Sequence, residues 1–239
     1  MKIYYIYHSC FIVETDSSFL IFDYFKHDKQ INGDFKFEEL FSKIINSIKP
    51  LYVFSSHSHQ DHFNYNILSW SNEKENIYYI LSNDIKLYEK KENAYTAGKN
   101  EELSINNIKI NTFGSTDAGV SFMIYVDGLI IFHAGDLNWW KWMDDTLEEE
   151  TQMENAFKKI IKDIMIKDIH MDVAFFPVDG RLEANYSCGG KYFIEQLKPK
   201  IFIPMHFWDN FNITTEFIMS LPQSQTQIIE IKHNNEILL

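Results

Sequence analysis

Residues 57–62 of the sequence include four side chains that can bind a metal ion. The segment reads His57-Ser58-His59-Gln60-Asp61-His62 and follows the apolar run 51–54. Imidazole nitrogens and carboxylate oxygens are common ligands of zinc, manganese, iron and nickel. Four such groups in so short a stretch favour metal binding over an ordinary solvated turn.

The spacing within this segment suggests two metal positions. Residues two apart in an extended chain point to the same side, so His57 and His59 can face one ion. A turn after them can bring Asp61 and His62 to a second ion. The run 51–54 must then be a strand that delivers the motif.

The pattern His-x-His-x-Asp-His after a hydrophobic strand resembles the signature of the metallo-β-lactamase superfamily. The N-terminal segment His8-Ser9-Cys10-Phe11, with a later apolar run that ends in Asp23, resembles the opening of that superfamily. It is particularly similar to the branch that includes the ascorbate-6-phosphate lactonases. The resemblance implies an α/β fold, the four-layer αβ/βα sandwich, with one or two divalent metal ions at one rim. Zinc is the first choice, and manganese, iron and nickel are the alternatives.

The resemblance also implies metal ligands from distant parts of the chain. An apolar run leads to Gly135-Asp136, where the family has a carboxylate that bridges two metals. His206 follows the apolar run 200–204 and matches the last ligand of the family. Together with Asp61 and His62, these two residues complete the ligand set of the second ion.

The first ion lacks one ligand of the family pattern. Ser115 stands where the family places a histidine, and a neutral hydroxyl is a poor ligand beside imidazole. His57 and His59 therefore have an incomplete partner set. Three outcomes stay open: a weakly bound first ion completed by water or Asp117, a single ion at the second position, or a protein that binds a ligand without hydrolysis.

Three further residues are candidates for substrate contact. Arg181 is the only arginine in the chain; it can hold a carboxylate or phosphate, or pair with Asp179 or Glu183. Trp139 is one of three closely spaced tryptophans, which form either a wall over the substrate or an anchor for the following helix. His8 either lies near the site or is a hydrogen-bonded structural histidine.

The resemblance implies a metal-dependent hydrolase that uses a metal-activated water. Asp61 is then both a ligand and the catalytic group that orients the water or accepts its proton. The implied substrate is a small molecule, such as a lactone, an ester or a phosphodiester. A non-catalytic protein that binds a metal or a ligand is the alternative, and Ser115 is the residue that favours it.

Periodicity and turn signals predict alternating strands and helices in two βα halves of one domain over residues 1–239. Strands are expected at 3–7, 11–15, 19–22, 51–54, 77–81, 102–105, 108–113, 120–126, 129–133, 171–178 and 200–204. Helices are expected at 38–48, 63–70, 84–89, 153–165, 188–197 and 212–221. A loop is expected at 24–37, and a closing hairpin at 227–231 and 236–239.

The composition limits the classes of partner. The net charge of −12 indicates no positively charged surface for nucleic acid or an acidic membrane. This weighs against an RNA-processing role. No apolar run approaches the roughly 18 residues of a membrane span. With no signal peptide and only two cysteines, a cytoplasmic protein is the simplest interpretation. The oligomeric state stays open.

Overall fold

A computed structural model describes residues 1–27 and 33–239. The chain divides into two compact units, Met1–Ala97 with Ile231–Leu239, and Gly98–Glu230. Each unit is built on one seven-stranded sheet. The loop predicted over 24–37 includes residues 28–32, which lie outside the described part of the chain.

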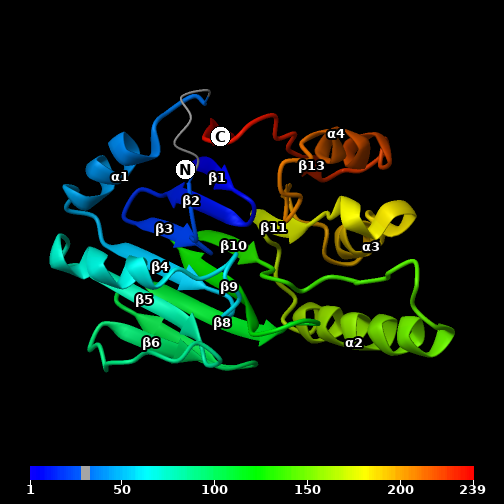
Figure 1. Ribbon diagram of the computed structural model, residues 1–239, viewed down its shortest axis with the longest axis horizontal. Coiled ribbons are helices and arrows are strands. Elements are labelled where there is room, and N and C mark those ends of the chain that lie inside the picture. The colour runs from blue at the N-terminus through cyan, green and yellow to red at the C-terminus, as the bar shows by residue number, and fades with distance from the viewer. Residues whose placement is uncertain (28–32) are drawn as a thin grey trace. The chain divides into compact units, whose positions relative to one another are not determined.

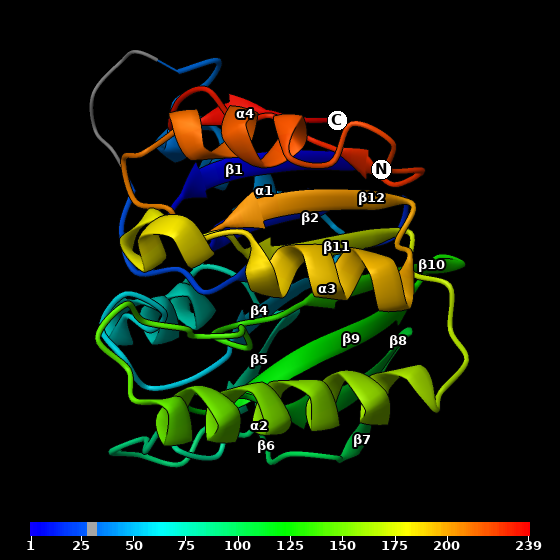
Figure 2. The ribbon, with the colours of Figure 1, turned by 90° about the vertical axis from the view of Figure 1, so that its right-hand side faces the viewer.

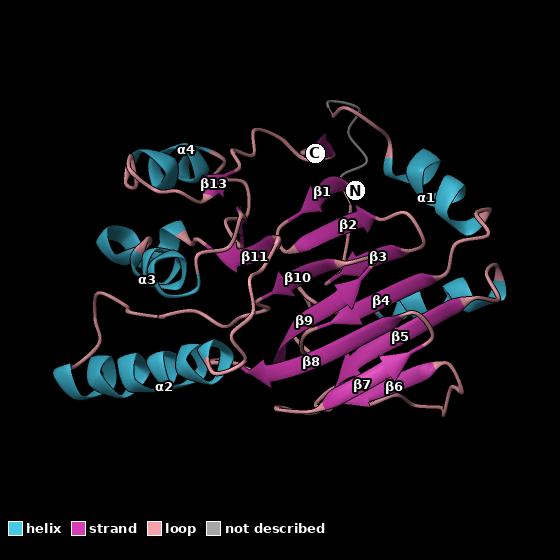
Figure 3. Ribbon diagram, turned by 180° about the vertical axis from the view of Figure 1, so that it is seen from behind, coloured by secondary structure: helices cyan, strands magenta, loops and turns pink. Residues whose placement is uncertain are grey.

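The sheet of the first unit has the strand order β14-β1-β2-β3-β4-β5-β6, and Figure 3 shows β1 to β6 side by side. Its strands are β1 (Lys2–Tyr7), β2 (Cys10–Glu14), β3 (Phe19–Phe22), β4 (Leu51–Ser55), β5 (Ile77–Ser82), β6 (Ala94–Ala97) and β14 (Glu236–Ile237). β1, β2 and β3 pair antiparallel, whereas β3, β4, β5 and β6 are parallel. The residues that follow β3, β4 and β5 therefore meet at one edge of the sheet.

Two helical segments cover one face of this sheet, α1 (Phe37–Ile45) and the 3₁₀ helix η1 (Tyr65–Asn72) (Figure 1). α1 buries Leu40 and Ile44, which lie on one side of a helix because they are four residues apart. η1 buries Ile67 and Trp70 in the same hydrophobic cluster. The cluster packs the two helical segments against one face of the sheet.

The sheet of the second unit has the order β13-β12-β11-β10-β9-β8-β7. Its strands are β7 (Glu102–Ile105), β8 (Ile108–Gly114), β9 (Val120–Val126), β10 (Leu129–His133), β11 (Val173–Pro177), β12 (Ile201–Met205) and β13 (Gln227–Ile228). β10, β11, β12 and β13 are parallel, and the remaining pairs are antiparallel. The residues after β10, β11 and β12 again meet at one sheet edge.

Aromatic rings join the helices of the second unit to its sheet. The helices are α2 (Leu147–Met165), the 3₁₀ helix η2 (Gly180–Asn185), α3 (Cys188–Leu197) and α4 (Asn212–Met219), and Figure 2 shows α2, α3 and α4 along the sheet. Phe176 on β11 lies 6.3 Å from Phe157 of α2 and 4.6 Å from Phe193 of α3, between ring centroids. Phe202 on β12 lies 5.2 Å from Phe217 of α4. These contacts set the positions of the loops that follow β11 and β12.

Two mixed sheets flanked by helices confirm the predicted α/β fold class. The helix predicted at 84–89 is wrong, because this segment turns directly after β5. The closing hairpin is also wrong, since β13 pairs with β12 and β14 pairs with β1. Both cysteines are free. Among the described residues, no helix has the length and apolar character that a membrane span requires.

Candidate metal centre

The loop that follows β4 is held by Asp23, which follows β3. Asp23 is fully buried, and its Oδ1 accepts the backbone N–H of Ser56 at 2.7 Å. Its Oδ2 accepts the Ser56 hydroxyl at 2.7 Å and lies 2.8 Å from His62 Nδ1. One carboxylate thus fixes both ends of the segment 56–62. Asp23 is missing from the predicted site, although its place at the end of an apolar run was a usable signal.

His8, Asp61 and His62 form one group of candidate ligands in the first unit. One donor atom of each lies within 4.8 Å of the others. Asp61 Oδ2 is 3.4 Å from His8 Nε2 and 3.8 Å from His62 Nε2. Burial raises the pKa of Asp61, but the two histidines lower it more, so the pKa lies well below its usual range. His8, a predicted substrate contact, therefore lies among the candidate ligands.

His57 and His59 bring two imidazole nitrogens together, although β4 already ends at Ser55. His57 Nε2 lies 3.0 Å from His59 Nδ1. The other nitrogen of His57, Nδ1, lies 3.0 Å from the hydroxyl of Ser56. The two rings present adjacent donor atoms, as predicted, but they do so from a bend and not from the extended chain that the prediction assumed.

In the second unit, Asp136, Asp179 and His206 follow the three parallel strands β10, β11 and β12, and all three are buried. His206 Nε2 lies 3.4 Å from Asp136 Oδ1, and Nδ1 lies 2.9 Å from Asp179 Oδ2. Burial lowers the pKa of His206, but the two carboxylates raise it more, to about 10. Asp179 is a second residue missing from the predicted site.

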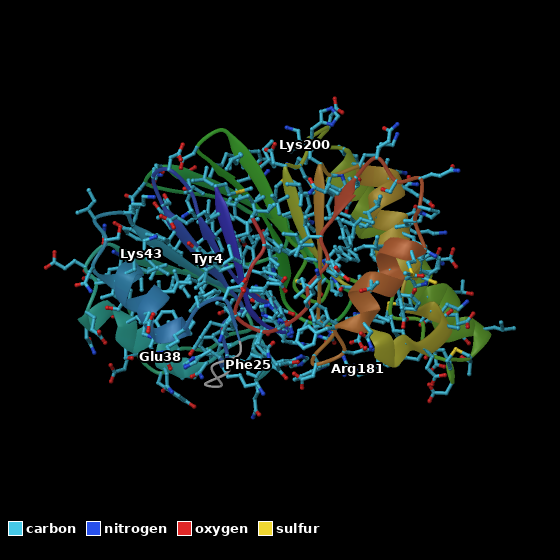
Figure 4. All side chains as sticks on the ribbon, turned by 90° about the horizontal axis from the view of Figure 1, so that it is seen from above. Tyr4, Phe25, Glu38, Lys43, Arg181 and Lys200 are labelled. Atoms are coloured by element: carbon cyan, nitrogen blue, oxygen red, sulfur yellow. The ribbon has the colours of Figure 1, made fainter. Side chains whose placement is uncertain are left out.

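Arg181 binds Asp179 through two guanidinium nitrogens. Its Nε and Nη2 lie 2.9 Å and 2.6 Å from Asp179 Oδ2. Burial raises the pKa of Asp179, whereas hydrogen bonds from His206 and Arg181 lower it to about 2. The side chain of Arg181, labelled in Figure 4, is 51% exposed. The pairing with Asp179 is confirmed, and substrate contact by Arg181 stays a prediction.

The loop that contains Ser115 is bound to the Asp136 loop. Ser115 Oγ accepts the N–H of Asp117 at 3.2 Å. Thr116 Oγ1 donates to the Asn138 carbonyl at 2.6 Å and accepts the Asn138 N–H at 3.0 Å. One carboxylate oxygen of Asp117 lies within 4.8 Å of one from Asp136. The candidate ligand beside Asp136 is therefore Asp117.

The tryptophans after Asp136 divide between two environments. Trp139 lies 6.0 Å from Phe157 of α2 and 6.1 Å from Tyr192 of α3, between ring centroids. Trp140 lies 5.4 Å from the His206 ring, and its Nε1–H donates to the Asp136 carbonyl at 3.0 Å. Trp140 is thus the tryptophan beside the candidate ligands, and substrate contact by Trp139 stays a prediction.

Three site residues have left-handed backbone conformations that residues other than glycine rarely adopt. The φ angles are 58° for His8, 44° for Asp23 and 65° for His206. Gly135, directly before Asp136, has φ 52°, which glycine adopts without a Cβ clash. Such conformations cost on the order of 1–3 kcal/mol each and gather at functional sites.

Gly189 lies in the first turn of α3, where a side chain would collide with the Asp136 loop. An added Cβ would meet Asn138 Oδ1 and would lie 3.0 Å from the backbone nitrogen of Trp139. We expect Gly189→Ala to lower the free energy of unfolding by about 1–3 kcal/mol, measured by urea denaturation. Gly114→Ala is the matched control, because its Cβ would lie 3.5 Å from Ile160, an ordinary contact. Equal losses in the two variants would contradict this close approach.

The donor atoms fit divalent metal ions. In each unit a buried aspartate binds Nδ1 of a histidine, Asp23 that of His62 and Asp179 that of His206. Nε2 of each histidine faces another carboxylate. Histidines that bind metals have such an outer partner, which fixes the ring and its tautomer.

Known structures share this fold. Igni18, a novel metallo hydrolase from the archaeon Ignicoccus hospitalis, is 17% identical over 99% of this chain and 97% of its own, with a TM-score of 0.64. An isothiocyanate hydrolase from Delia radicum gut bacteria is 11% identical over 100% and 99% of the two chains, with a TM-score of 0.56. CmlA, a diiron β-hydroxylase from Streptomyces venezuelae, is 10% identical over 99% of this chain and 53% of its own, with a TM-score of 0.64. At these identities the likeness shows the fold alone.

Sequence comparison points to the same family. No curated protein sequence matches the chain. A family model, the β-lactamase superfamily domain, matches residues 2–150, which is more than half of the sequence and includes the motif at 57–62. The chain therefore belongs to the β-lactamase superfamily.

Proposed function

We propose that this protein is a metal-dependent hydrolase of a small substrate, such as a lactone, an ester or a phosphodiester. The observation that carries the proposal is the arrangement found in each unit, a histidine between an outer and an inner aspartate. Family membership supports it, as do the hydrolase names of Igni18 and the isothiocyanate hydrolase. The similarity to the ascorbate-6-phosphate lactonases stays a prediction.

The proposed metal ligands are the six residues that the sequence motifs name. They are His57, His59, Asp61, His62, Asp136 and His206. Zinc is the proposed metal, with manganese, iron and nickel as alternatives, because imidazole and carboxylate suit all four. Asp117 is the proposed replacement for the family histidine at Ser115.

A bound divalent ion would lower the pKa of a coordinated water from about 15.7 to about 7 and polarise the substrate oxygen. Asp61 then orients the attacking water and accepts its proton. The low pKa of Asp61 keeps its carboxylate ionised. Asp179 holds the His206 ring through Nδ1, so that Nε2 keeps its direction.

Chelation provides the first test of hydrolysis. We expect protein reloaded with zinc or manganese to hydrolyse at least one member of a panel of lactones, esters and phosphodiesters. Removal of the metal with a chelator should abolish this activity, and reloading should restore it. Activity that survives complete metal removal would contradict the proposal.

A non-catalytic protein that binds a metal or a ligand is the second candidate function. Ser115 favours it, because the family histidine is absent there and Asp117 is exposed. Stoichiometric metal without turnover on any substrate of the panel would support this alternative.

A further inference from the structure

Three parallel strands of the first unit, β3, β4 and β5, deliver polar residues to one sheet edge. Asp23 follows β3, the segment 56–62 follows β4, and Asp84 lies in the turn after β5. The metal-binding segment therefore lies between two aspartates that come from neighbouring strands. Asp23 contacts the histidine ring of His62, and Asp84 contacts the backbone of the same segment.

Asp84 accepts a hydrogen bond from the centre of the His-x-His motif. Its Oδ2 lies 2.9 Å from the backbone nitrogen of Ser58, the residue between His57 and His59. Asp23 makes the equivalent contact to the nitrogen of Ser56, at 2.7 Å. The backbone N–H groups of Ser56 and Ser58, two residues apart, are thus each held by an aspartate carboxylate.

The backbone around Asp84 is itself fixed. The N–H of Ile85 donates to the Ser82 carbonyl at 3.0 Å, which closes the turn. The N–H of Asn83 donates to the carbonyl of Ala97 on β6 at 3.0 Å. Asp84 is therefore anchored to two strands of the sheet and can serve as a rigid acceptor for the segment.

We propose that Asp84 is a positioning residue that sets the directions of His57 and His59 by holding the N–H of Ser58. The proposal rests on the proposed function, in which these two histidines bind metal. Without the acceptor, the Ser58 N–H turns to water and the two rings lose their common direction. Outer partners of metal ligands typically contribute about 10–100-fold in affinity, and Asp84 acts at this scale.

The test combines hydrogen exchange with metal titration in Asp84→Ala, Asp84→Asn and the surface control Asp16→Ala. In metal-free protein, we expect Asp84→Ala to lose protection at the Ser58 amide while the Ser56 amide, held by Asp23, stays protected. Asp84→Asn should keep this protection, because its amide oxygen can still accept. The Mn²⁺ affinity of the weaker position, the one proposed at His57 and His59, should fall about 10–100-fold in Asp84→Ala, and both Mn²⁺ affinities of Asp16→Ala should equal wild type.

Two outcomes overturn the role of Asp84. One is a Ser58 amide that stays protected in Asp84→Ala, and the other is an unchanged Mn²⁺ affinity despite lost protection. If the alanine variant does not fold, the same measurements of amide protection and Mn²⁺ affinity are made on Asp84→Ser, with the same expected results. Absence of Mn²⁺ binding by the wild type would count against the proposed function, while the exchange result still decides whether Asp84 holds Ser58.

Discussion

Replacing Asp61 by alanine is expected to lower kcat/KM for the hydrolysed substrate by about 10³-fold, within the 10²–10⁴-fold range of a lost acid–base group. Asp61 is the carboxylate that approaches both His8 and His62, and it remains ionised because these histidines outweigh its burial. Its removal takes away a proposed metal ligand and the group proposed to accept the proton of water. The measurement is steady-state kinetics on the metal-loaded variant.

Two comparisons make the Asp61 result specific. Asp16→Ala removes an exposed aspartate of the same unit and should keep wild-type kinetics. Asp61→Asn keeps the shape of the side chain but cannot accept a proton as a carboxylate does, so it should also be strongly impaired. Full hydrolysis and an unchanged metal content in Asp61→Ala would show that this mechanism is wrong.

Replacing Asp136 by alanine is expected to weaken metal binding by more than about 100-fold, because loss of an outer partner alone costs about 10–100-fold. Asp136 is buried and faces both His206 and Asp117, so it is the carboxylate that the proposed ligand sets share. Metal content after dialysis, together with isothermal titration, measures the effect. Retention of wild-type metal content would contradict the assigned role of Asp136.

Asp117→Ala separates the two proposed metal positions. Asp117 is exposed, and one of its carboxylate oxygens lies within 4.8 Å of one from Asp136. The Asp117→Ala variant should therefore lose the more weakly bound ion. It should keep the ion that we propose to be bound by Asp61, His62, Asp136 and His206. Asp144→Ala, at another exposed aspartate of this unit, should leave the metal content unchanged.

The sequence was most informative where function is local. The four candidate ligands within 57–62 could be proposed from the sequence because they are continuous in the chain, and the apolar strand before them is present as β4. Asp136 and His206 were found through the ends of apolar runs. The α/β fold class was implied by the resemblance of the motifs to the family, the alternation of apolar runs with helical stripes agreed with it, and the two mixed sheets confirm it.

The roles of Asp23, Asp84 and Asp179 could not be predicted in the same way. Each accepts a hydrogen bond from a backbone or ring nitrogen in a loop that follows a neighbouring strand. Local periodicity predicts strands but does not tell which strands are neighbours in the sheet. Asp84 was instead expected to begin a helix at 84–89. Its carboxylate accepts the Ser58 N–H, so Asp84 binds a backbone N–H of the loop after β4 and does not cap a helix of its own.

The gap at Ser115 shows what a motif alone leaves open. The sequence left water, Asp117 and a lost metal position as alternatives. Thr116 binds the neighbouring loop at Asn138, and this bond brings the Asp117 carboxylate toward Asp136. This hydrogen bond joins residues 22 positions apart in sequence. It therefore favours Asp117 over water as the replacement for the missing ligand.

The most direct test is anomalous diffraction from crystals grown with Mn²⁺, which locates each ion and its ligands. We expect a strong peak bound by Asp61, His62, Asp136 and His206, and a weaker peak bound by His57, His59 and Asp117. Manganese that binds none of these residues, in protein that is folded and metal-loaded, would contradict the assignment of this protein as a metal-dependent hydrolase.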